Sequence, residues 1–226
     1  MPQTPNLLND DKSASMATML LLSHHAFRRD IARLIAAVAK IKSGDASHTE
    51  AVRNEWEKSY RQALHGHHTA EDTNIFPDLR SKHPELATAL DKLTAQHHQI
   101  DPIIEQGDAA FANLTHPEEA EAVLHKLKEL LDQHLTFEEA EITPSLRDSK
   151  EFPAPANEEM ANMYAQGFAW SMQGIAPEVL TAVKAMLPQV LVAKLSAAQA
   201  AFEKHSHEVW GMQTESASTT SIPEGY

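Results

Sequence analysis

Residues 67–80 read H-H-T-A-E-D-T-N-I-F-P-D-L-R, and residues 134–147 read H-L-T-F-E-E-A-E-I-T-P-S-L-R. Both copies place a Glu four residues after the first His and a Pro ten residues after it, and both end in P-x-L-R. Residues four apart lie on one face of an α-helix, one turn above the other. Each copy therefore directs an imidazole and a carboxylate toward the same side, as a metal site requires.

Apolar residues recur at steps of three and four on both sides of these motifs, which is typical of helices with one buried face. The predicted helices cover residues 15–42, 47–76, 84–112 and 117–144. Histidine interrupts the apolar face of every one of them, and two faces also carry a Glu; these residues are His24, His67, Glu71, His97, His134 and Glu138. Short connections make successive helices antiparallel. The pattern predicts an all-α fold, an antiparallel up-down four-helix bundle with a helical C-terminal extension.

The rest of the chain differs from the predicted bundle in composition. We expect a flexible N-terminal tail (1–14), the bundle (15–147), a Pro-containing linker (148–156), a helical C-terminal extension (157–212) and a disordered, Ser/Thr-rich tail (213–226). Helices are predicted in the extension near 157–173, 177–187 and 188–210. Its Met and Trp side chains make the C-terminal helices a candidate homodimer surface.

Charge and cysteine content exclude several functional classes. The net charge is −13, which disfavours nucleic acid and anionic membrane surfaces as partners. The chain has no cysteine, so disulfides, thiolate zinc sites and cysteine-ligated iron–sulfur clusters are excluded. We find no signal-peptide pattern and no apolar run of transmembrane length. These features predict a cytoplasmic protein.

The six His and Glu residues at the buried faces form a candidate metal site. A single His on an apolar face is usually a hydrogen-bonded core residue, but four at matched depth beside two carboxylates favour a metal, because a buried carboxylate without compensation is costly. Six such ligands exceed what one zinc with an open position takes. Mixed nitrogen and oxygen donors suit iron or manganese better than calcium. We therefore expect two iron ions.

The sequence also resembles a known family. The segments H-H-A-F-R-R-D-I-A-R-L (24–34), H-H-T-A-E-D-T-N-I-F-P (67–77) and Q-H-H-Q-I-D-P (96–102) are similar to those of the hemerythrin-like, or HHE cation-binding, domain, over residues 16–147. The resemblance implies a four-helix bundle around a non-heme di-iron centre, with the same six residues as ligands.

The resemblance also implies functions. Members bind or sense dioxygen, nitric oxide or peroxide, and we expect one of these small ligands here. The alternative is a di-iron enzyme that turns over hydrogen peroxide or nitric oxide, and the sequence leaves open whether there is turnover. Iron storage is less supported, because the E-x-x-H motifs of ferritin-like sites are absent.

Several positions depart from the oxygen-carrying hemerythrins. Asp101 stands where the carriers have a further His, so it is a candidate oxygen ligand or a partner that orients His97. The carriers place their last acid five residues after the final His; Glu139 has that spacing, and we prefer Glu138 because it matches Glu71. These departures argue against reversible oxygen carriage.

Neighbouring residues offer further candidates. His68 is a candidate seventh ligand, since some relatives use this position. Tyr60 is a candidate hydrogen-bond donor or redox participant near the site. His25 and His98 each follow a predicted ligand but are out of phase with the apolar faces.

Overall fold

The computed structural model describes residues 6–210, and in this range the regular elements are all helical. They are α1 (Met16–Lys42), α2 (Thr49–Glu55), the π-helical η1 (Trp56–Tyr60), α3 (Arg61–Ala70), the π-helical η2 (Glu71–Ile75), α4 (Phe76–Lys82), the 3-10 turn η3 (Pro84–Leu86), α5 (Ala87–Ala112), α6 (Pro117–Leu146), α7 (Glu158–Ser171), α8 (Pro177–Met186) and α9 (Gln189–Trp210). None of the helices in the described part of the chain is long and apolar enough to cross a membrane.

The chain divides into two compact units. One is Phe27–Glu141, which we call the bundle unit; the other combines Met1–Ala26 with Ile142–Tyr226, and we call it the extension unit. The division falls inside α1 and inside α6, so each of these helices supplies residues to both units. The first 26 residues group with the C-terminal helices, and the predicted boundary at residue 147 stays a prediction.

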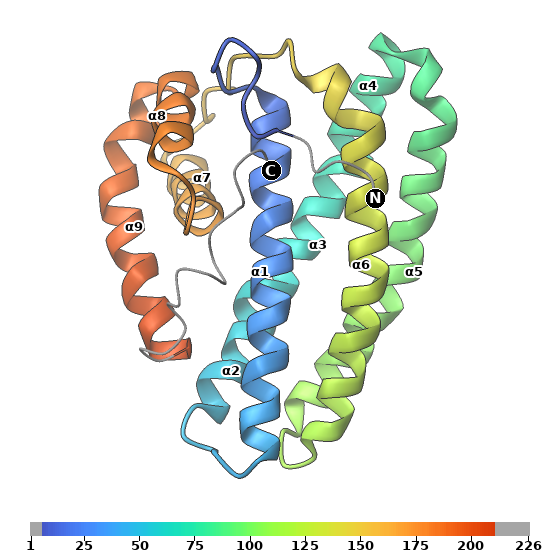
Figure 1. Ribbon diagram of the computed structural model, residues 1–226, viewed down its shortest axis with the longest axis vertical. Coiled ribbons are helices and arrows are strands. Elements are labelled where there is room, and N and C mark those ends of the chain that lie inside the picture. Colours follow the sequence, from blue (N-terminus) through green and yellow to red (C-terminus); the bar gives the residue numbers. More distant parts are fainter. Residues whose placement is uncertain (1–5, 211–226) are drawn as a thin grey trace. The chain divides into compact units, whose positions relative to one another are not determined.

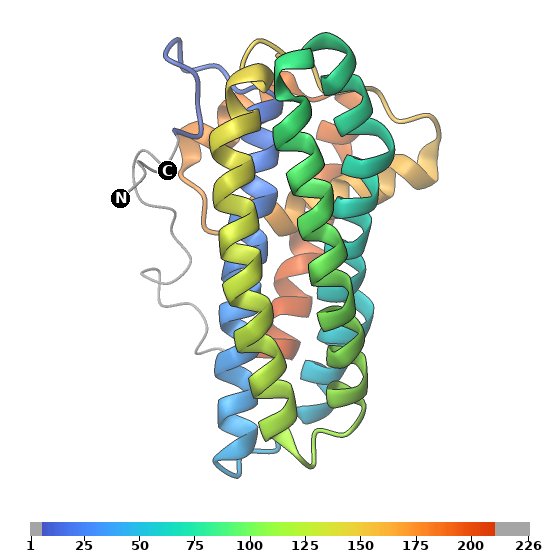
Figure 2. The ribbon, with the colours of Figure 1, turned by 90° about the vertical axis from the view of Figure 1, so that its right-hand side faces the viewer.

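The bundle unit is the predicted four-helix bundle. Its four helical segments belong to α1, to the continuous run from α2 to α4, to α5 and to α6, and they run side by side with alternating directions (Figures 1 and 2). Their apolar faces meet in the interior, where Ile31, Leu64, Leu93 and Leu131 are fully buried. The predicted fold class is therefore confirmed.

Aromatic packing fills one part of the bundle interior. The Trp56 ring stacks on Phe111 at 4.6 Å between centroids and on Tyr60 at 6.0 Å. The Trp56 indole N–H donates to Asp108 at 3.0 Å. Gly107 makes this packing possible, because a Cβ there would lie 2.1 Å from the Trp56 ring.

Two helices extend past prolines at which the sequence predicts an end. The second predicted helix continues through Pro77 to Lys82, and α6 continues through Pro144 to Leu146. Pro77 lies directly after the π-helical turn η2, where the regular pattern of bonds to the residue four back is already interrupted. Pro144 lies in the last turn of α6, where its missing N–H removes only one terminal hydrogen bond.

The extension unit has an apolar interior. Helices α7, α8 and α9 follow the predicted ranges closely, and α7 packs against α9. Their buried side chains join the start of α1 in one cluster, whose fully or almost fully buried members are Leu21, Leu22, Ala161, Val183, Leu191 and Leu195. The side chain of Asn157 caps α7 by accepting a hydrogen bond from the Met160 backbone N–H at 2.8 Å.

The described part of the predicted N-terminal tail belongs to the same unit. Leu7 and Ala14 are buried in its apolar cluster. The Asn9 side chain donates to the Arg147 carbonyl at 3.0 Å, and Thr18 donates to the Leu7 carbonyl at 2.7 Å. Residues 6–14 therefore contact both α1 and the end of α6. The predicted disordered tail, residues 213–226, lies outside the described residues.

Candidate metal centre

Three buried imidazoles from three helical segments of the bundle unit form the first group of ligands. His68, His97 and His134 each offer a ring nitrogen, and these nitrogens lie within 4.8 Å of one another. The His68 and His97 rings stack at 4.1 Å between centroids. The Nε2 atoms of His97 and His134 are 3.3 Å apart. His68, which the sequence suggests only as an additional ligand, thus contacts the rings of the predicted ligands His97 and His134.

A second group combines an imidazole with two carboxylates. Ligand atoms of His67, Glu71 and Glu138 also lie within 4.8 Å of one another. Both carboxylates are fully or almost fully buried, whereas the His67 side chain is 14% exposed. Glu138 also approaches the first group, with Oε2 3.7 Å from His134 Nε2.

The Glu71 carboxylate connects the two groups. Its Oε1 lies 3.0 Å from His67 Nε2, and its Oε2 lies 3.4 Å from His97 Nε2. Each oxygen of this one side chain thus faces an imidazole of a different group. This one carboxylate therefore contacts imidazoles of both groups.

His24 lies on α1, fully buried, in the part of that helix that groups with the extension unit. Helix α1 is continuous from Met16 to Lys42, so His24 lies on the same face as Phe27, one turn earlier. The Phe27 ring contacts the His67 ring at 5.1 Å between centroids. At Phe27, therefore, this face of α1 is directed at the second group.

The helix that carries both His67 and His68 is locally widened. The π-helical segment η2 begins at Glu71, and the Phe76 N–H bonds to the Glu71 carbonyl, five residues back. Single π turns occur often at functional sites, because they change the direction of side chains along a helix. Three side chains of this run contact His97: the His68 ring stacks on its ring, the Glu71 carboxylate faces its Nε2, and the Asp72 carboxylate faces its Nδ1.

Two polar side chains hold imidazoles of the first group from outside. His97 Nδ1 lies 2.9 Å from Asp72 Oδ2, and Thr94 donates to the other oxygen of Asp72 at 2.7 Å. His134 Nδ1 lies 3.2 Å from Gln96 Oε1. Both rings thereby direct Nε2 toward the interior. Neither Asp72 nor Gln96 was predicted from the sequence, although each is the immediate neighbour of a predicted ligand.

The charges around His97 alter its protonation. Burial of the ring disfavours the charged form, but hydrogen bonds and charge from Glu71 and then Asp72 outweigh this effect. Together they raise the pKa of His97 above its ordinary value of 6.5. The Glu71 and Asp72 carboxylates therefore favour the positively charged form of this imidazole.

Comparison with known proteins identifies the family. The model of the hemerythrin HHE cation-binding domain matches residues 15–146, which is more than half of the chain. The chain belongs to the hemerythrin HHE family. No curated protein and no solved structure was found to match it. The predicted family is thus confirmed, and with it a cation-binding role for the hemerythrin domain.

The donor set fits the cation that this family name implies. Imidazole nitrogens and carboxylate oxygens are the ligands that iron accepts in mixed sites. Burial of the Glu71 and Glu138 carboxylates beside four imidazoles costs free energy unless positive charge compensates it. Within the described residues of this hemerythrin domain, the two groups supply that arrangement.

The other candidate residues near the site have different surroundings from the two groups. Glu139, the acid with the spacing of the oxygen carriers, pairs with Arg28 at 2.5 Å, whereas Glu138 lies in the second group. His98 is exposed. The Tyr60 hydroxyl donates to the Phe27 carbonyl at 3.4 Å, and burial raises the pKa of Tyr60 well above its ordinary value.

The predicted role of Asp101 remains untested. Asp101 is half-buried on α5. The carboxylate that bonds to His97 is that of Asp72. A role for Asp101 as a ligand, or as a second partner of His97, therefore stays a prediction.

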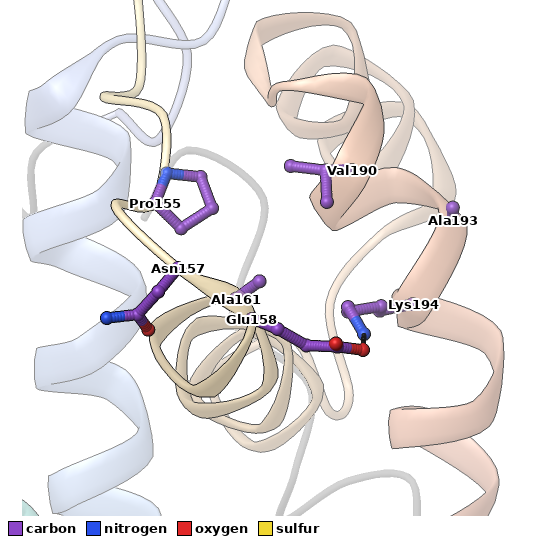
Figure 3. A pocket seen from close by; sticks show the side chains of 7 residues that line it. All are labelled: Pro155, Asn157, Glu158, Ala161, Val190, Ala193 and Lys194. Atoms are coloured by element: carbon purple, nitrogen blue, oxygen red, sulfur yellow. Dashed lines mark hydrogen bonds and ion pairs between the residues drawn. The ribbon is translucent and has the colours of Figure 1, made fainter.

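A separate groove lies in the extension unit. Its cavity volume is about 470 Å³, and Figure 3 shows it between the start of α7 and the first turns of α9. The lining is mostly small and apolar, and its two charged side chains, Glu158 and Lys194, pair with each other at 3.3 Å. This groove has no group of metal ligands.

Proposed function

We propose that this hemerythrin domain holds two iron ions and uses them to bind or sense dioxygen, nitric oxide or peroxide. His68, His97 and His134 would hold one ion, and His24, His67 and Glu138 the other. Glu71 would be shared. Support for His24 comes from the face of α1, where Phe27 contacts His67 one turn later.

The position of Glu71 is the observation that carries the proposal. This fully buried carboxylate faces His67 with one oxygen and His97 with the other. A single-metal site would not need a carboxylate between two groups of ligands. A purely structural network would bury the charge of Glu71 at a cost that a pair of cations removes.

The protein side chains would orient ligands and exclude water. Asp72 and Gln96 bond to the Nδ1 atoms of His97 and His134, which leaves both Nε2 atoms directed inward. Phe76 stacks near His97 at 5.7 Å and Phe27 near His67 at 5.1 Å between ring centroids, so apolar groups flank the site. Bound iron supplies the open coordination position and the change of oxidation state that small oxidising ligands require.

Elemental analysis of protein from iron-replete cells tests the proposal. We expect about two iron ions per chain. The matched variants Glu138→Gln and Glu139→Gln remove the same charge at adjacent positions of α6. We expect Glu138→Gln to lose iron and Glu139→Gln to retain it, since Glu139 pairs with Arg28. One zinc ion, no metal, or equal iron in both variants would contradict the assignment.

Turnover distinguishes the binding or sensing role from the alternative, a di-iron enzyme. A binding protein gives a stable adduct with nitric oxide or dioxygen, and consumes no more than stoichiometric peroxide. An enzyme consumes peroxide or nitric oxide catalytically, and loses this activity in His67→Ala. The enzyme alternative gains no support from Tyr60, because its hydroxyl bonds to the Phe27 carbonyl.

The C-terminal helices remain a proposed homodimer surface. Phe168 and Met172 of the predicted apolar segment are buried within the extension unit, whereas Met163 is 57% exposed. An interface through α7 would therefore use the side that carries Met163. Light scattering of Met163→Glu beside the unaltered protein measures this contribution directly.

A further inference from the structure

We propose that Asp72 is a positioning residue that supplies negative charge to the imidazole-rich group, and that Gln96 is its neutral counterpart on His134. This inference rests on the proposed function. It assigns roles to two side chains that are not themselves ligands, and it makes the two metal positions unequal.

The two groups differ in charge. His67 lies with two carboxylates, Glu71 and Glu138. The first group consists of three imidazoles, which Glu71 approaches at 3.4 Å and Glu138 only at 3.7 Å. A cation held by neutral imidazoles keeps its charge in a buried site, where the lack of compensation is costly. Within the bundle unit, the imidazole-rich group therefore benefits most from another anion close by.

Asp72 delivers that anion through His97. Its Oδ2 lies 2.9 Å from His97 Nδ1, the nitrogen opposite the inward Nε2. A carboxylate on the far nitrogen of a metal-binding imidazole fixes the ring and makes it a stronger donor. Thr94 donates to the second oxygen of Asp72 at 2.7 Å. Thr94 and His97 are on α5 and Asp72 is on η2, so this contact also fixes one helix against the other.

Gln96 holds His134 by the same kind of contact without the charge. Its Oε1 lies 3.2 Å from His134 Nδ1. His97 and His134 therefore present their Nε2 atoms 3.3 Å apart, one with an anionic partner and one with a neutral partner. Because Gln and Glu have nearly the same shape, the chain offers a position to which the charge can be moved.

Anaerobic titration with ferrous iron, read as iron bound per chain and by Mössbauer spectroscopy, tests the proposal. In Asp72→Asn we expect one of the two ions to bind about 10- to 100-fold more weakly, which is the usual effect of losing such a partner. Asp72→Glu should recover most of the affinity. The double variant Asp72→Asn with Gln96→Glu should also recover it, because the negative charge returns to the same group through His134.

The matched control is Asp91→Asn, which removes an exposed carboxylate of α5 that pairs with Arg80. It should bind iron as the unaltered protein does. Asp101→Asn tests the competing assignment: a loss of iron there, with none in Asp72→Asn, would overturn the proposal.

Gln96→Glu alone keeps the proposal testable if Asp72→Asn does not fold. This variant should bind the same ion more tightly and lower its reduction potential, whereas a purely structural contact predicts neither change. Two iron ions bound with unchanged affinity in Asp72→Asn would overturn the role of Asp72 and leave the di-iron proposal standing. No iron in the unaltered protein would overturn both.

Discussion

Both units of this chain bury apolar side chains, but they differ in the ionisable groups buried beside them. The bundle unit buries histidines and carboxylates, among them His97, His134, Glu71 and Glu138. The extension unit buries an apolar cluster that runs from Leu7 to Leu195. Apolar burial stabilises the second interior without any ligand, whereas the first contains charges that a bound cation would compensate. The stability of the two regions should therefore depend on different conditions.

The largest expected effect lies in the apolar interior. Leu191→Ala removes a fully buried side chain, and we expect the free energy of unfolding to fall by about 2–5 kcal/mol. Its neighbour Val190 is 47% exposed, so Val190→Ala should change stability by less than about 0.5 kcal/mol. Urea unfolding measures both. Iron per chain should not change in either variant, and a loss of iron in Leu191→Ala would show that the two interiors are coupled.

Iron removal should affect the bundle unit next most strongly. A ligand that binds only the folded state, present at 100 times its dissociation constant, adds about 2.7 kcal/mol of stability. Hydrogen exchange before and after chelation can be read separately for residues 27–141 and for α7–α9. We expect protection to fall in the bundle unit first. Equal loss in both units would mean that the polar interior does not depend on metal more than the apolar one.

Two glycines of the bundle unit allow its aromatic packing and its candidate metal site to be tested separately. A Cβ at Gly107 would lie 2.1 Å from Trp56, so Gly107→Ala should destabilise the protein by about 1–3 kcal/mol. Gly66, beside His67, has nothing within 4 Å of such a Cβ, and Gly66→Ala should stabilise the helix by up to about 1 kcal/mol. Thermal unfolding gives the signs. Iron content that stays constant in Gly107→Ala would show that the aromatic packing is independent of the site.

The smallest expected effect concerns one exposed ion pair in each unit. Lys150 bonds to Asp11 at 2.5 Å and lowers the pKa of Asp11, so this contribution is present above pH 3.8 and is lost as the pH falls below it. Glu121 bonds to Lys42 and raises the pKa of Lys42, so that contribution is present below pH 10.5 and is lost as the pH rises above it. The unfolding midpoint of Asp11→Asn should differ from that of the unaltered protein above pH 3.8, and the difference should vanish as the pH falls below it. The midpoint of Glu121→Gln should differ below pH 10.5, and the difference should vanish as the pH rises above it. Solvent screening keeps both effects small.

Hydrophobic periodicity predicted the helices of both units well, because a helix with one buried face has a strong sequence signal. It did not predict that the chain divides inside α1. The face with Phe27 and Ile31 belongs to the bundle, but Leu21 and Leu22 pack with the C-terminal helices. A truncation of the C-terminal helices would therefore expose apolar residues of α1 as well.

The candidate site was predictable where ligands share a helix. His67 with Glu71, and His134 with Glu138, are one turn apart, so spacing alone pairs them. Contacts across helices carry no such signal. The bond between Asp72 and His97 joins η2 to α5, two elements whose contact no sequence spacing predicts.

The π-helical segment η2 also bears on the evolutionary relationship between the two motif copies. Both copies place Pro six residues after Glu. In the first copy a π turn spans Glu71–Ile75, whereas in the second copy α6 continues without one through Pro144. Identical spacing thus leads to two different rotations of the backbone beyond the Glu. A duplication of one ancestral helix, aligned by these motifs, would superimpose residues that face different sides.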